Sequence, residues 1–141
     1  MKKTAFIAII CSLVIACSKD SPVGPSLTGK WQLTAIFLQP TGVGSWYTED
    51  SIPPDYVQFN TDGTLNMSPY VSSLFGSPSK YKISSDSTIT MHYTSPHEAN
   101  NFYPANSFYF KLTDSVLLIY PPDMELAIEK FIKVKAGTSP Q

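Results

Sequence analysis

The stretch GKWQLTAIF, residues 29–37, sets a pattern that much of the chain repeats. Apolar side chains stand at every second position of this stretch: Trp31, Leu33, Ala35 and Phe37. Polar residues separate the first of them: Lys30, Gln32 and Thr34. A spacing of two places successive apolar side chains on the same face of an extended chain. The stretch therefore predicts a β-strand with one buried face.

Short runs with the same spacing follow, at residues 56–60, 64–68, 80–84, 88–93, 108–112 and 128–135. Residues 116–120 are a continuous apolar run, which is typical of a strand covered on both faces. Polar turns lie at residues 61–63, 84–87 and 113–115. About eight strands joined by hairpins predict an all-β fold, a small antiparallel up-and-down β-barrel. A β-sandwich is the alternative, because both architectures bury one face of each strand.

Three longer segments interrupt the hairpins, at residues 40–54, 69–79 and 95–105. All of them contain proline or glycine, which favours loops over regular elements. Each also carries a pair of aromatic residues: Trp46 and Tyr47, Tyr70 and Phe75, and Phe102 and Tyr103. These aromatic residues either line the mouth of the barrel or fold over its end and complete the core.

Several motifs together resemble the lipocalin-like lipoproteins common in Bacteroidota. They are LTGKWQL at residues 27–33, FNTDGT at 59–64, YKISSDSTIT at 81–90 and EKFIK at 129–133. The resemblance implies a lipocalin-like barrel domain over residues 28–135. It also implies that Gly29 and Trp31 close one end of the barrel, with a basic side chain packed on the indole. Because the chain has no arginine, we expect Lys130 or Lys133 to make this cation–π contact.

The N-terminus has the layout of a secretory signal peptide. Two lysines, Lys2 and Lys3, precede an apolar run at residues 5–16, which is too short to span a bilayer. The end of this run, VIAC at residues 14–17, resembles a bacterial lipobox. The resemblance implies cleavage before Cys17 and attachment of lipid to that residue, so neither Cys17 nor Cys11 enters a disulfide.

The chain is thus expected to contain four segments. Residues 1–16 are a lipoprotein signal peptide, 17–27 the lipidated cysteine and a flexible tether, 28–135 the barrel domain and 136–141 a disordered tail. The sequence SKD at residues 18–20 resembles the short signals that export Bacteroidota lipoproteins to the cell surface. We therefore expect an outer-membrane protein held by its lipid anchor, facing either the cell exterior or the periplasm.

The sequence offers little for chemistry. Removal of the signal peptide leaves eight lysines against eleven acids, a formal charge of −3, which argues against nucleic-acid binding. The two histidines, His92 and His97, have no further ligand at a spacing typical of zinc sites. No nucleophile elbow and no glycine-rich phosphate loop is present. We expect no enzymatic activity, no metal and no cofactor.

Two functions fit these features. The first is binding of a small apolar ligand inside the barrel, by side chains assigned to its inner face: Leu33, Phe37, Phe59, Tyr81, Ile83, Met91, Phe108, Phe110, Leu118 and Tyr120. The same residues would equally fill a packed core. The second function is that of a non-enzymatic accessory protein of the envelope, which recognises a protein or glycan through its aromatic loops.

Overall fold

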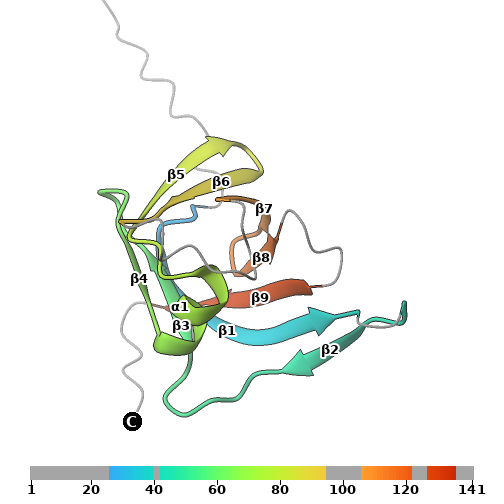
Figure 1. Ribbon diagram of the computed structural model, residues 1–141. Helices are drawn as coiled ribbons and strands as arrows, with labels where there is room; N and C mark the ends of the chain where they lie inside the picture. Colours follow the sequence, from blue (N-terminus) through green and yellow to red (C-terminus); the bar gives the residue numbers. More distant parts are fainter. Residues whose placement is uncertain (1–25, 40–41, 95–105, 122–126, 136–141) are drawn as a thin grey trace, which may run out of the picture.

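The computed structural model describes residues 26–39, 42–94, 106–121 and 127–135. They form nine strands and one short helix (Figure 1). The elements are β1 (Gly29–Leu38), β2 (Ser45–Thr48), β3 (Tyr56–Phe59), β4 (Leu65–Met67), α1 (Pro69–Phe75), β5 (Lys80–Ser85), β6 (Thr88–His92), β7 (Ser107–Leu112), β8 (Val116–Tyr120) and β9 (Ala127–Lys133).

Eight of the strands curl into a nearly closed antiparallel barrel. Neighbours follow the order β4-β3-β1-β9-β8-β7-β6-β5, and β2 pairs separately with the second half of β1. The barrel closes between β4 and β5 through one bridge, Thr64–Lys80, and two backbone hydrogen bonds. The amide of Leu65 donates to Ser79 O at 2.9 Å, and that of Tyr81 to Gly63 O at 2.8 Å. The predicted all-β, up-and-down barrel is therefore confirmed.

The first strand carries an irregularity that the alternation of its sequence conceals. Its register against β9 shifts between Leu33 and Ala35, which marks a β-bulge. Trp31 and Leu33 point into the barrel, and after the bulge Ile36 does so in place of Phe37. A bulge inserts one residue, so every side chain beyond it changes face.

The barrel interior is packed with large side chains. The largest side chains that are less than 2 % exposed are Trp31, Phe59, Phe75, Phe108, Phe131, Leu33, Ile89, Met91, Leu117, Ile119, Glu129 and Val57. Aromatic rings contact one another in edge-to-face geometry, with 5.4 Å between the ring centres of Phe75 and Phe108. An eight-stranded barrel encloses just enough space for side chains, and here they occupy it.

The end of the barrel where β1 begins is closed as the Gly-x-Trp motif predicts. Gly29 adopts a φ of +127°, which glycine accepts far more readily than other residues, and Trp31 is fully buried. The indole Nε1 donates to Leu27 O at 2.7 Å. Lys133 Nζ lies 5.0 Å from the indole ring and donates to Ser26 O at 3.0 Å. Of the two lysines predicted for this role, Lys133 is the one that fills it.

Helix α1 covers the opposite end, where β4 leaves the sheet (Figure 1). Val71 and Phe75, one turn apart on the helix, are both fully buried. The hydroxyl of Tyr93 donates to Phe75 O at 2.8 Å and holds the end of the helix. The sequence predicts a loop here, and neither this helix nor strand β2 was expected. Of the two roles considered for the loop aromatics, Phe75 takes the second, because it completes the core.

Candidate functional site

Five of the predicted ligand-binding residues are buried in the barrel: Leu33, Phe59, Met91, Phe108 and Phe110. Tyr81 is half-buried beside them, with its ring edge against Phe59 and its hydroxyl donating to Asn60 O at 2.9 Å. These side chains pack against one another in the core. In the described residues, these side chains therefore form a packed core, which was the alternative to a ligand-binding interior.

Four other residues on that list do not line the interior. Phe37 faces outward because of the bulge in β1. Leu118 and Tyr120 also face outward, because Leu117 and Ile119 supply the buried face of β8. Ile83 lies opposite the buried Ile89 but is 49 % exposed, since β5 extends past its contact with β4. The inward placement of Phe37, Leu118 and Tyr120 was wrong, whereas Ile83 shares the inner face with Ile89 but lies beyond the enclosed part of the barrel.

Several predicted residues lie outside the described ranges. They include Cys17 and its neighbours, His97, Phe102 and Tyr103. Of the remaining loop aromatics, Trp46 and Tyr47 lie in β2, where they are 48 % and 53 % exposed. Tyr70 lies in α1 and is 40 % exposed. Three aromatic side chains are thus available to solvent near the strand ends.

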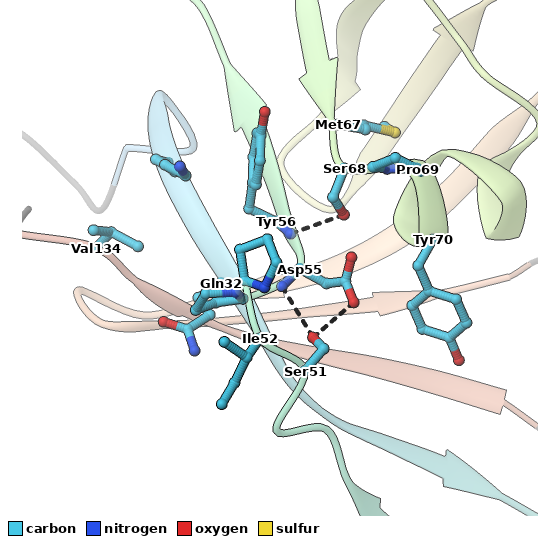
Figure 2. Close-up of a pocket in the computed structure, with 13 residues that line it drawn as sticks. Gln32, Ser51, Ile52, Asp55, Tyr56, Met67, Ser68, Pro69, Tyr70 and Val134 are labelled. Carbon is cyan, nitrogen blue, oxygen red and sulfur yellow. Dashed lines mark hydrogen bonds between the residues drawn. The ribbon is translucent and has the colours of Figure 1, made fainter. Parts of the chain in front are cut away.

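A hollow lies on the outside of the barrel (Figure 2). It has a volume of about 760 Å³ and is bounded by β1, β3, the loop before β3 and the start of α1. Its lining is largely apolar: Ile52, Pro53, Pro54, Met67, Pro69, Tyr56, Tyr70 and Val134. We call this hollow the outer cleft. Its size falls within the range of small-molecule sites.

Hydrogen bonds fix the polar part of the outer cleft. Ser51 Oγ donates to Asp55 Oδ2 at 2.7 Å and accepts the backbone N–H of Asp55 at 3.2 Å. Ser68 Oγ accepts the backbone N–H of Tyr56 at 3.1 Å, and the Ser68 amide donates to Tyr56 O at 3.0 Å. Both serines thus tie loops to the edge of β3 (Figure 2). The cleft is shaped by internal bonds before any ligand arrives.

Electrostatics distinguish the two sides of the cleft. Burial, followed by the negative charges of Glu49, Asp55 and Glu129, raises the pKa of the Tyr70 phenol above its ordinary value. Tyr70 consequently stays protonated at neutral pH and can donate a hydrogen bond. On the other side, Lys30 Nζ lies 3.9 Å from the centre of the Tyr56 ring. The cleft offers an acceptor, a neutral donor and an apolar wall.

A second, smaller hollow of about 520 Å³ lies by β5 near the closed end. Ile83, Phe110, Leu112 and Leu27 form its apolar side. Within the described residues, no group of three or more histidine, cysteine, aspartate or glutamate side chains is placed to hold a metal ion. The described ranges also contain no helix that is long and apolar enough to cross a membrane.

The outer cleft was not predicted from the sequence, although some residues that frame it carry local signals. Ser68, Pro69 and Gly76 are the residues preferred at the start and end of a helix, and they bracket α1. The paired prolines Pro53 and Pro54 mark the loop before β3. No sequence signal shows that this loop and α1 meet over β3, because that contact depends on the curl of the sheet.

Comparisons with known proteins leave the chain without a relative to argue from. No family model matches it, and neither the curated proteins nor the solved structures that were searched include a match. Functional inference therefore rests on the geometry described above.

Proposed function

We propose that this protein is a lipid-anchored envelope protein that binds a small, mainly apolar ligand without chemical turnover. The binding place we propose is the outer cleft rather than the barrel interior. The observation that supports it is the cleft itself, about 760 Å³ and walled by Ile52, Pro53 and Pro54, beside a barrel that its own side chains fill. Ile52 is 96 % exposed, so its side chain is accessible to a ligand at the mouth of the cleft.

The ligand class follows from the polar groups of the cleft. Asp55 supplies a carboxylate that is 9 % exposed, and Tyr70 supplies a hydroxyl that stays protonated. Few polar groups on an apolar wall are typical of sites that orient a ligand by one or two hydrogen bonds. We propose a molecule with an apolar body and one hydrogen-bonding group. The anchor is proposed from the lipobox at residues 14–17.

Native mass spectrometry of protein purified from its own envelope tests the binding function. The expected result is a co-purifying small molecule whose occupancy falls at least about tenfold in Tyr70→Ala. Tyr47→Ala, which removes an exposed tyrosine of β2 that does not line the cleft, is the matched control and should retain the molecule. Wild-type protein that carries no small molecule, and gives no fluorescence increase with the neutral probe N-phenyl-1-naphthylamine, would contradict the proposal.

The anchor has a separate test. Mass spectrometry of the mature N-terminus is expected to find an acylated Cys17 as the first residue. A mature chain that begins elsewhere without lipid would remove the anchor and leave the cleft proposal intact.

A further inference from the structure

The outer wall of five neighbouring strands carries a continuous row of large side chains. Phe37 of β1 is paired with Trp46 of β2 and with Ile128 of β9. Tyr109 of β7 is paired with Tyr120 of β8. The register of β8 and β9 ends at the pair Ile119–Glu129, so its next step places Tyr120 beside Ile128. The row therefore crosses β2, β1, β9, β8 and β7.

All five side chains of this row face away from the core. For the four that lie in β1, β9, β8 and β7, neighbours in sequence supply the buried face: Ile36, Ala127, Glu129, Ile119, Phe108 and Phe110. Trp46 lies on the same outer side as its partner Phe37. Trp46 is 48 % exposed and Tyr109 is 59 % exposed, while the other three are half-buried. With neighbouring strands about 4.8 Å apart, the row is about 19 Å long when followed around the curve of the barrel. We call it the aromatic row.

Lysines accompany the aromatic row, and acids are missing from it. Lys130 Nζ lies 5.8 Å from the Trp46 ring, and Lys111 Nζ lies 5.6 Å from the Tyr120 ring. The only acidic residue within these five strands is Glu129, which points into the barrel and is 1 % exposed. Within the described parts of these five strands, the charged side chains that point outward are therefore all lysines, although the mature chain has more acids than lysines.

Tryptophan, tyrosine and lysine, which this wall presents, are residues that favour a membrane interface. Aromatic rings with a polar edge settle at the headgroup level, and each lysine near an anionic surface adds about 1 kcal/mol of attraction. Outward aliphatic side chains on the same wall, Leu118 and the 41 % exposed Ile132, add apolar area. The composition and the charge of this wall both favour a membrane surface as its partner.

We propose that this wall docks on the surface of a bilayer that contains anionic lipid. The setting rests on the anchor proposed above, since Cys17 and Ser26 are nine residues apart and this length of chain reaches about 30 Å at most. A tether of that reach keeps the barrel beside the membrane. Docking through the aromatic row would then fix the orientation of the barrel as well as its distance.

The test uses the mature chain, residues 17–141, with Cys17→Ser so that no acyl chain contributes. Co-sedimentation is measured with vesicles of phosphatidylcholine, with and without phosphatidylglycerol. The chain with an unchanged wall is expected to bind vesicles with phosphatidylglycerol more strongly than vesicles without it. Its affinity for the anionic vesicles should fall as the salt concentration rises. The double variants Trp46→Ala/Tyr109→Ala and Lys111→Ala/Lys130→Ala are each expected to lose at least about tenfold in binding.

Two matched control variants distinguish binding through the wall from non-specific binding to vesicles. Tyr47→Ala removes an equally exposed tyrosine from β2, one position from Trp46 and on the other face of the strand. Lys82→Ala removes an exposed lysine from β5, away from the wall. Both should bind vesicles as the parent does. Circular dichroism melting curves show whether each variant is folded.

Tryptophan fluorescence gives a second readout of the docked surface. Trp31 is fully buried, so a blue shift on addition of anionic vesicles is expected to come from Trp46 and to vanish in Trp46→Phe. Failure of the parent to bind anionic vesicles would overturn the proposal, as would equal losses in Tyr47→Ala. A stable protein complex that needs Trp46, formed while vesicles are not bound, would overturn it in favour of a protein interface. None of these outcomes depends on whether Cys17 is acylated.

Discussion

The inner and outer faces of the β1–β9–β8–β7 wall are built from similar residues and have different surroundings. On β8, Leu117 and Ile119 are fully buried, while Leu118 and Tyr120 between and beyond them face outward. On β9, Phe131 is fully buried and the next residue, Ile132, is 41 % exposed. Apolar character alone therefore does not tell which face of a strand becomes core.

The difference between the faces is one of packing. Inner side chains are surrounded by other side chains on all sides, so their removal leaves a cavity. Outer side chains are covered on one side only, and their removal changes little that the fold needs. Large residues on the outer face thus call for a reason outside folding, and docking on a membrane supplies one.

The difference between the inner and outer faces of the wall is tested most strongly by substitutions at two neighbouring positions of β9. Phe131→Ala is expected to lower the free energy of unfolding by about 3–5 kcal/mol, because it opens a cavity in the core. Ile132→Ala should cost less than about 1 kcal/mol, because that side chain already contacts water. Urea denaturation followed by circular dichroism measures both. Equal losses at the two positions would show that the outer face is also part of the core.

The next largest loss of folding stability is expected at the closed end of the barrel. Gly29→Ala places a side chain at a φ of +127° and is expected to cost about 1–3 kcal/mol through backbone strain. An added Cβ would lie 3.5 Å from the Lys133 stem, an ordinary contact, so crowding contributes little. Gly42→Ala is the control, with a φ of +82° and open space around it, and should cost less. The same denaturation experiment reads both variants.

At the end of the barrel covered by α1, a hydrogen bond joins Tyr93 to the helix. Tyr93→Phe removes the bond to Phe75 O and is expected to cost about 1 kcal/mol at neutral pH. Burial raises the pKa of Tyr93 above its ordinary value of 10.0. The unfolded chain therefore loses this proton first, and stability falls as the pH rises from that value toward the folded pKa.

Alkaline titration separates this effect from a purely steric one. Unfolding midpoints of wild type and Tyr93→Phe should converge as the pH rises above 10.0, because only the wild type has a buried phenol to ionise at this site. A constant difference across the alkaline range would contradict the assignment.

The smallest change in folding stability is expected for a substitution in an exposed turn, at Asp62. Asp62 Oδ1 accepts hydrogen bonds from Thr64 Oγ1 at 2.7 Å and from the Thr64 amide at 3.0 Å. The Thr64 side chain, and then its backbone N–H, lower the pKa of Asp62 below its ordinary value of 3.8. Its stabilising effect is therefore complete above that value and is lost as the pH falls through the folded pKa.

Asp62→Asn should accordingly be slightly less stable than wild type at neutral pH and should approach it in acid. Thermal melting between neutral and strongly acidic pH measures this difference. A gap that widens as the pH falls would show that the carboxylate does not stabilise the turn.

The candidate site could be predicted from sequence only in fragments. The residues that define the outer cleft come from the loop before β3, the start of α1, and outward positions on β1 and β3. Serine and proline signals mark the first two of these segments, but nothing local indicates that they meet. The aromatic row is likewise assembled by register across five strands, and register is a property of pairs of strands.

Sequence by itself determined the all-β class, the up-and-down order of hairpins, and the closure of one barrel end by Gly29, Trp31 and a lysine. The first two follow from spacing and turn residues, which are local features, and the third was implied by the family resemblance of the motif at residues 27–33. Only the tertiary structure decided the faces of β1 and β8. A bulge shifts Phe37 outward, and a continuous apolar run such as residues 116–120 has no alternation from which a face can be chosen. The curl of the sheet then decides which of two apolar faces is enclosed and which remains in contact with its surroundings.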